Sequence, residues 1–234
     1  MPAPLAGVLF DVDGTLVDST YFHTLAWWHA FRRFDHDVRM NAIHRCIGMG
    51  GDKLVDSLLG PERDRSQDQE VMDTHAAVFS TFWPHLRAFD GARDLLARSR
   101  DAGLKVVLAS SAREQDLGAL RAALGADDVV DAATSSADAE QSKPAPDILV
   151  AALKAVGLEA SEVLFVGDAV WDVQAAGALG ITTVGVASGG YSGAELTDAG
   201  AAEVFDSPRD LLDGFEGSLI GKRLGASAAL RPAP

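Results

Sequence analysis

Short runs of apolar residues recur along the chain, and each of them ends in polar or turn-forming residues. A brief apolar run bounded in this way is typical of a buried strand. Nearly every position within these runs is apolar, which is expected when helices cover both faces of a parallel sheet. We therefore predict strands over residues 5–10, 105–110, 129–134, 162–168 and 182–187, with a weaker strand over residues 203–206.

Helical patterns separate the later apolar runs. Strands that alternate with helices in this way indicate a parallel sheet with crossover helices. The pattern therefore predicts the α/β fold class, with a Rossmann-like, doubly wound parallel sheet as its core. The helices of this core are predicted over residues 92–102, 114–124, 146–156 and 173–179.

Residues 20–86 interrupt the alternation, because they contain no convincing strand and several helical patterns. In the first pattern, Phe22, Leu25, Ala26 and His29 lie on one helical stripe. A stop signal, Gly60-Pro61, follows the second pattern. The predicted helices span residues 21–34, 52–59 and 68–82, the last ending before Pro84.

This all-helical block divides the chain into two predicted domains. The α/β core is formed by residues 1–16 and 87–234, and the inserted helical domain by residues 17–86. A block of this size is reasonable for a small domain. The two crossings between the domains, near residues 17–20 and 84–91, are candidate hinges.

Composition limits the classes of partner. The 234 residues carry 34 acidic against 20 basic side chains, a formal net charge of −14, which argues against a nucleic-acid partner. The single cysteine, Cys46, cannot form an intramolecular disulfide, and the sequence shows neither a signal peptide nor a membrane span. We therefore expect a soluble, cytoplasmic protein with no membrane partner. The tail from Gly217, rich in Ala, Gly and Pro, is expected to fray.

Two carboxylates, Asp11 and Asp13, follow the first predicted strand and precede Gly14. In an open α/β sheet, ligands bind outside the carboxyl ends of the strands. Two carboxylates placed there can divide the work, one as a nucleophile and the other as a general acid and base. Gly14 lets the chain leave the strand sharply and approach a ligand closely. The alternative is a simple capped turn, because Asp is common in turns.

Later segments carry further polar side chains of the required kinds. Ser110 and Ser111 follow the second strand, and Lys143 precedes a predicted helix. Asp168 ends the fourth strand, and Asp172 follows one helical turn later. Taken singly, each has an ordinary structural explanation, such as a helix cap, a surface charge or a turn. Their common placement around one predicted sheet indicates a shared site.

In this order the residues resemble the motif set of the haloacid dehalogenase-like superfamily: Asp-x-Asp-Gly-Thr, then Ser or Thr, then Lys, then Gly-Asp-x-x-x-Asp. The resemblance covers residues 5–16 and 90–206, and the inserted helical block occupies the place of that family's cap domain. The flanking Leu16-Val17-Asp18-Ser19 and His23-x-x-Ala26-Trp27 look like the branch that holds phosphoglycolate phosphatases and beta-phosphoglucomutases.

The resemblance implies phosphoryl transfer. Asp11 would attack phosphorus and form an aspartyl-phosphate, while Asp13 would protonate the leaving alcohol and then activate water. Asp13 would have to begin protonated, so we expect crowding by the other carboxylates to raise its pKa. Ser110 would bind phosphoryl oxygens, and Lys143 would neutralise the nucleophile and the transferring group.

The resemblance also implies Mg²⁺, which prefers oxygen ligands and keeps water and substrate phosphate around it. The carboxylates of Asp11 and Asp168 and the backbone carbonyl of Asp13 would hold it. Asp172 would lie near the metal or contact its ligands from outside. For His23, a purely structural role is the open alternative. Substrate contacts are expected from Gly14, Thr15, Ser111, His23, Arg45 and Lys53, the last two toward a distal group.

The leading prediction is a Mg²⁺-dependent phosphatase for a small phosphorylated metabolite of the sugar phosphate or phosphoglycolate type. One alternative is a beta-phosphoglucomutase-like mutase, which the few lysines of the cap and Gly14-Thr15 disfavour. Another is a non-catalytic domain that binds phosphometabolites, which the intact Asp13 disfavours. We expect a monomer or a homodimer. A bound metal would reconcile an anionic substrate with the net charge of −14.

Overall fold

The computed structural model describes residues 3–60 and 62–229. It contains six strands: β1 (Gly7–Phe10), β2 (Lys105–Ala109), β3 (Ala132–Thr134), β4 (Val163–Gly167), β5 (Thr182–Val186) and β6 (Glu203–Phe205). They form one parallel sheet in the order β3-β2-β1-β4-β5-β6. All six predicted strands are confirmed, and each is shorter than the apolar run that predicted it.

The strand order reverses beside β1, which confirms a doubly wound sheet. β1 pairs with β2 on one side and with β4 on the other, so that Phe10 lies opposite both Leu108 and Val166. In such a sheet the ligand crevice lies outside the carboxyl ends of the strands, at this switch point. The fold therefore directs attention to the residues that follow β1 and β4.

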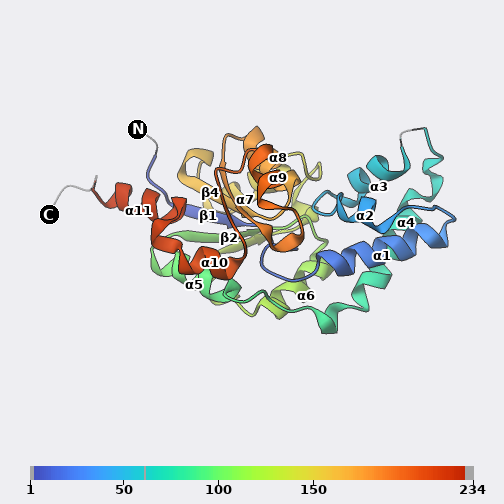
Figure 1. Ribbon diagram of the computed structural model, residues 1–234, viewed down its shortest axis with the longest axis horizontal. Helices are drawn as coiled ribbons and strands as arrows, with labels where there is room; N and C mark the ends of the chain where they lie inside the picture. Colours follow the sequence, from blue (N-terminus) through green and yellow to red (C-terminus); the bar gives the residue numbers. More distant parts are fainter. Residues whose placement is uncertain (1–2, 61, 230–234) are drawn as a thin grey trace.

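Helices cover both faces of the sheet (Figure 1). Successive strand residues alternate between the faces, so Val8 and Phe10 join one apolar cluster while Leu9 joins another. Burial on both faces explains why the strands are apolar almost throughout. The first face is covered by α5 (Ala92–Asp101), α6 (Glu114–Leu124), α10 (Pro208–Asp213) and α11 (Leu219–Ala229), the second by α7 (Asp147–Val156) and α8 (Val170–Ala178), with α9 (Gly193–Ala199) packed on α8.

The four predicted core helices are confirmed, but the prediction for the tail is wrong over residues 217–229. There α11 packs against the core and buries Ile220 completely, with Leu219 and Leu224 beside it. Apolar residues at this spacing outweigh the Ala- and Gly-rich composition that suggested fraying. The last part of the predicted tail, residues 230–234, lies outside the described residues.

The inserted segment folds into helices, which lie at one end of the molecule (Figure 1). The predicted helices over 21–34, 52–59 and 68–82 are confirmed within two residues at each end, and Gly60 follows the second. The short α2 was not predicted, and Pro61 of the stop signal lies outside the described residues. The helices are α1 (Thr20–Arg33), α2 (Met40–His44), α3 (Gly51–Leu59) and α4 (Asp68–Ser80).

The stripe of α1 that was identified from the sequence is buried only in part. His29 is exposed and Leu25 is only partly buried, whereas Trp27 and Phe31 are buried in a separate apolar cluster of the inserted segment. These two rings lie one turn apart, and Leu54 of α3 belongs to the same cluster. The large aromatic residues therefore decide which face of α1 is buried.

The two crossings between the inserted segment and the sheet lie side by side. Val17 forms an antiparallel bridge with Ala88, and the backbone amide of Asp18 donates to the carbonyl of Arg87 at 2.9 Å. The division into a core and a domain of residues 17–86 stays a prediction. Within residues 3–60 and 62–229, the helices are too short or too polar to cross a membrane.

Candidate active site

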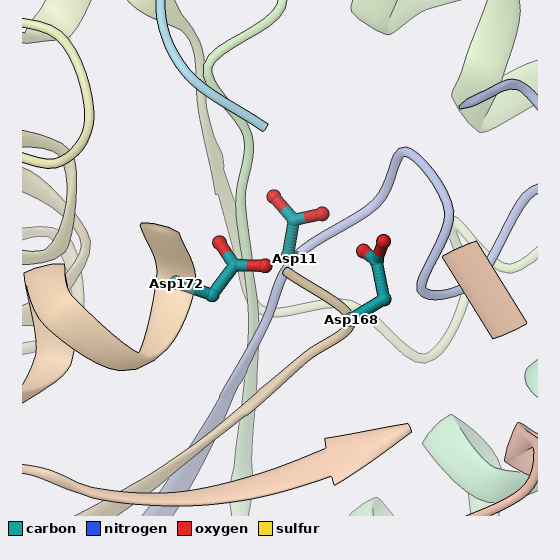
Figure 2. A group of neighbouring side chains, drawn as sticks. All are labelled: Asp11, Asp168 and Asp172. Carbon is teal, nitrogen blue, oxygen red and sulfur yellow. The ribbon is translucent and has the colours of Figure 1, made fainter. Parts of the chain in front are cut away.

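Three carboxylates meet at the switch point of the sheet. Asp11 directly follows β1, Asp168 directly follows β4, and Asp172 lies in the first turn of α8. Each is buried, and each offers an oxygen within 4.8 Å of the others. Figure 2 shows the three carboxylates around a common space beyond the strand ends. Sequence positions more than 150 residues apart thus form one acidic cluster.

Lys143 supplies the positive charge nearest to this cluster. Its ammonium group donates to Oδ1 of Asp11 at 2.6 Å and to Oδ1 of Asp172 at 2.7 Å. The side chain is almost completely buried. Burial acts to lower the pKa of Lys143, but the two carboxylates outweigh burial and raise it. Lys143 is therefore charged, and its position beside Asp11 agrees with the sequence prediction.

A single lysine leaves the three carboxylates with surplus negative charge. Burial, reinforced by the charge of Asp172, raises the pKa of Asp11 to about 7 against the opposing effect of Lys143. Burial raises the pKa of Asp168 well above its usual range, and the charges of Asp172 and Asp11 add to the effect. Burial and mutual repulsion prevent the three carboxylates from all being ionised at once. A divalent cation would offset this charge, and carboxylate oxygens are hard donors that bind such cations well. These residues could hold a metal ion.

The turn after β1 positions the cluster. Thr15 donates from its hydroxyl to Oδ1 of Asp168 at 2.7 Å, and that hydroxyl lies 3.4 Å from Oδ2 of Asp11. Gly14 has a φ of 79°, and a Cβ there would lie only 2.6 Å from Oδ2 of Asp168. Both residues were predicted to contact substrate. In the structure they lie directly against Asp168, outside the lining of the neighbouring pocket.

The side chain of Asp13 turns away from the acidic cluster. Its Oδ1 accepts a hydrogen bond from Ser19 at 2.5 Å and lies 3.0 Å from Nε2 of His23. Burial acts to raise the pKa of Asp13, but His23 and Ser19 outweigh burial and lower it. The expectation that crowding carboxylates raise this pKa is therefore wrong. The carboxyl group is ionised in the substrate-free protein because its nearest neighbours are donors rather than acids.

His23 links Asp13 to a second histidine, His75 of α4, which was not identified from the sequence. Nδ1 of His23 lies 3.1 Å from Nε2 of His75, and the ring of His23 stacks on Phe79 with centroids 3.7 Å apart. Burial lowers the pKa of His75 well below its ordinary value, so its ring is neutral. Its spacing from the buried Val71 and Phe79 was the available sequence signal, because i and i+4 positions share a helix face.

A pocket of about 370 Å³ opens between the strand ends and the inserted helices. Asp11, Asp13, His23 and Ser111 line it, so four of the predicted site residues face the same space. The hydroxyl oxygen of Ser111 is buried without a hydrogen-bond partner among the described residues, which suits a ligand atom in the pocket. Ser110 lies behind the lining, where its hydroxyl accepts the amide of Ala112 at 3.0 Å.

The two cations expected to reach substrate from the inserted segment do not line the pocket. Arg45 pairs with Glu195 at 2.5 Å and stacks over the ring of Tyr191, with 4.1 Å to the centroid. The ammonium group of Lys53 lies 3.9 Å from a carboxylate oxygen of Asp52. Arg45 and Lys53 therefore lie outside the lining of the pocket, although Asp52 is part of that lining, and their contact with substrate stays a prediction.

Comparison with known proteins agrees with this geometry. A family model described as haloacid dehalogenase-like hydrolase matches residues 5–180. Phosphoglycolate phosphatase from Rhodospirillum rubrum is 32% identical over 238 residues, covering 97% of this chain and 98% of that protein. The crystal structure of a hydrolase from Pseudomonas syringae matches with a TM-score of 0.86 and 34% identity, covering 91% of this chain and 98% of that chain.

A further relative is much longer than this chain. The chain is 32% identical over 225 residues to Protein SUPPRESSOR OF QUENCHING 1, chloroplastic, from Arabidopsis thaliana. The match covers 90% of this chain but 21% of that protein, so the likeness concerns one part of it. Together with the family model, which spans most of the sheet and the whole inserted segment, these matches identify the family. The chain belongs to the haloacid dehalogenase-like hydrolases.

Proposed function

We propose that this protein is a phosphatase that hydrolyses a small phosphorylated metabolite. The observation that carries the proposal is a buried carboxylate, Asp11, which lines the pocket and is held by Lys143 at 2.6 Å. A carboxylate paired with a fixed cation can attack phosphorus while the cation neutralises the transferring group. The relative from Rhodospirillum rubrum, named phosphoglycolate phosphatase, supports this choice of reaction.

The metal in this proposal is Mg²⁺, held by the carboxylates of Asp11, Asp168 and Asp172 together with the backbone carbonyl of Asp13. The surplus charge of the three carboxylates supports a divalent cation there. When bound, Mg²⁺ would neutralise the phosphate and the carboxylates that surround it. Thr15 keeps the Asp168 carboxylate in place through its hydrogen bond at 2.7 Å.

In the first chemical step, an oxygen of Asp11 forms a bond to phosphorus while the ester bond to the alcohol breaks. Lys143 stays beside Asp11 and stabilises the charge that develops on the phosphoryl group. Ser111, whose buried hydroxyl has no partner in the part of the chain that the structure describes, would bind a phosphoryl oxygen. The product of this step is an aspartyl-phosphate and a free alcohol.

Asp13 handles the proton in both steps. Its carboxyl group is ionised in the free protein, so it must gain a proton before it can protonate the leaving alcohol. The negative charge of a bound phosphate ester would raise the pKa of Asp13 and favour that uptake. After giving its proton away, the carboxylate accepts one from the water that attacks the aspartyl-phosphate and releases phosphate. His23 holds the carboxylate throughout, with 3.0 Å between Nε2 and Oδ1.

Residues 17–86 form the cap domain in this proposal, and they close over the pocket. Several of the lining residues, among them Trp27, Leu54 and Met72, belong to the inserted helices, so movement of this segment would open the site to solvent. The adjacent crossings, joined by the Val17–Ala88 bridge, would act as the hinge. A cytoplasmic location and a monomeric or dimeric state stay predictions from the sequence.

The experiment that tests the proposed function is release of inorganic phosphate from 4-nitrophenyl phosphate by the purified protein with Mg²⁺. We expect turnover that is lost on chelation and lost again in Asp11→Asn, which keeps the shape of the side chain but not its charge. Absence of turnover by the Mg²⁺-loaded protein would overturn the proposal. Conversion of beta-glucose 1-phosphate to glucose 6-phosphate faster than phosphate release would replace it with the mutase reaction.

A further inference from the structure

The pocket has two chemically different ends. The strand-end side presents the carboxylate of Asp11, the carboxylate of Asp13 and the hydroxyl of Ser111. The side formed by the inserted helices presents mainly carbon. We name this side the cap wall, and it consists of Trp27, Ile47, Met49, Leu54, Met72 and His75.

The cap wall includes an aromatic pair. The ring of Trp27 stacks on that of His75, with centroids 4.1 Å apart and an interplanar angle of 14°. Trp27, Ile47 and Leu54 are also buried in the inserted segment, so they are held in place. Packed aromatic and aliphatic side chains form a surface that binds apolar groups by excluding water from them.

The charges around the pocket are mostly negative. Besides Asp11 and Asp13, its lining includes Asp52 and Glu140. Among the described lining residues, Arg113 is the one lysine or arginine, and its guanidinium group already donates to Asp116 at 2.8 Å. Arg45 and Lys53 lie outside this lining, and the ammonium group of Lys53 is 3.9 Å from the carboxylate of Asp52.

The histidine of the cap wall does not replace those missing cations. Burial lowers the pKa of His75, and the charges of His23 and Arg113 lower it further. Its Nε2 is already engaged with His23 at 3.1 Å. His75 therefore meets a ligand as a neutral ring.

This distribution has opposite consequences for the two ends of a substrate. At the strand ends, Lys143 and a bound cation would offset the charge of a phosphate. A second anionic group placed against the cap wall would lose its water without gaining a cation, which is costly. It would also lie in a pocket lined by Asp52 and Glu140. An uncharged carbon group would instead gain from contact with the same wall.

We propose that the preferred substrate is a phosphate monoester whose alcohol part is uncharged and carries an apolar, ring-sized group against the cap wall. This inference rests on the proposed phosphatase function and specifies its substrate class. It predicts that a carboxylate on the alcohol part, as in phosphoglycolate, weakens the substrate. The chain would then differ in specificity from its relative named phosphoglycolate phosphatase.

The test compares two esters of benzylic alcohols that differ only in a para carboxylate, benzyl phosphate and 4-carboxybenzyl phosphate, with 2-phosphoglycolate as a third substrate. The para carboxylate is remote from phosphorus, so the two benzyl esters differ little in intrinsic reactivity. We expect kcat/KM for benzyl phosphate to exceed that of both carboxylates by about tenfold or more, because an unpaired buried anion is penalised. Equal or better turnover of the carboxylates would overturn the inference and leave the phosphatase function standing.

A matched pair of variants assigns the effect to the cap wall. Met72→Lys places a cation in the wall, and Met40→Lys places one on an exposed position of α2, outside the pocket. We expect Met72→Lys to narrow or reverse the preference for benzyl phosphate, and Met40→Lys to leave it unchanged. An unaltered preference in a folded Met72→Lys protein would contradict the role of the wall. If no ester is hydrolysed by the wild type, the phosphatase function fails and this inference falls with it.

Discussion

Lys143 is the residue on which the electrostatics of the site depend, because it lies between Asp11 and Asp172 and is itself buried. Ion pairs of this kind contribute little net stability compared with apolar packing, but removing one partner leaves an uncompensated charge in the interior. The residue therefore allows the carboxylates to be buried together, and in the proposed reaction it would also stabilise the phosphoryl group.

Replacing this lysine should damage both stability and activity. We expect Lys143→Met to lower the free energy of unfolding by about 3–5 kcal/mol, because Asp11 and Asp172 lose their shared cation. Lys105→Met is the control, since that exposed lysine pairs with Asp131 at 2.9 Å and should cost at most about 1 kcal/mol. Urea unfolding of both variants measures the difference. Equal losses of unfolding free energy in the two variants would show that the buried ion pairs of Lys143 stabilise the fold no more than an exposed pair does.

A substitution at Gly14 tests the role of the turn that positions Asp168. Its φ of 79° disfavours a side chain, and a Cβ would overlap with the Asp168 carboxylate. We expect Gly14→Ala to reduce kcat/KM by about 100-fold, since small misplacements of reacting groups are costly. Gly103→Ala is the matched control, with a φ of 83° and open space around its Cβ. It should cost about 1 kcal/mol of stability and leave the activity unchanged. Similar activities for both variants would contradict this role of Gly14.

At the scale of elements, α1 and α4 are joined through the histidine pair beside Asp13. His75 is neutral in the folded state and has an ordinary pKa of 6.5 when unfolded. Below that pH, His75 binds a proton in the unfolded chain but not in the folded chain. The contribution of His75 to folding stability therefore falls as the pH falls. The loss continues until the lowered folded-state pKa of His75 is reached.

Urea unfolding between pH 7.5 and pH 5.5 measures this effect. We expect His75→Gln to flatten the pH dependence of the unfolding free energy, removing up to about 1.4 kcal/mol per pH unit below 6.5. His29→Gln changes an exposed histidine of α1 and serves as the control. The same pH dependence in wild type and His75→Gln would mean that folding does not lower the pKa of His75.

The elements differ in how well the sequence predicts them. β1 and β4 follow directly from apolar runs, because burial on both faces leaves little room for polar residues. The short helices α9 and α10 were missed, although Ser192 and Ser207 cap them through the amides of Glu195 and Asp210. Their lengths are too small for a clear helical period.

The same contrast holds for the candidate site. Asp11 and Asp168 follow strands whose carboxyl ends share one edge, so their proximity could be predicted from the order of motifs. The contact of His75 with His23 and the position of Arg45 outside the pocket lining depend on how separate helices pack. A single sequence does not specify that packing. The direction of the Asp13 side chain, toward His23 rather than the cluster, likewise decides its pKa and could not be read from spacing.

At the scale of the whole molecule, binding of a cation to the acidic cluster should stabilise the fold. A ligand that binds only the folded state adds about 2.7 kcal/mol at 100 times its Kd. We expect Mg²⁺ to raise the melting temperature of the wild type, and chelation to reverse the shift. Asp168→Asn should abolish the shift, while Asp198→Asn, which changes an exposed acid, should retain it. An equal shift in both variants would mean that the cation binds elsewhere.

The proposed reaction requires that Asp11 becomes covalently phosphorylated, and acid quenching during turnover can trap that phosphoryl group. The protein is mixed with Mg²⁺ and benzyl phosphate, quenched within one turnover, digested and analysed by mass spectrometry. We predict one phosphoryl group on the peptide that contains Asp11, removed by hydroxylamine as expected for an acyl phosphate, and absent from Asp11→Asn. Turnover with no phosphorylated peptide, or undiminished turnover by Asp11→Asn, would contradict the account.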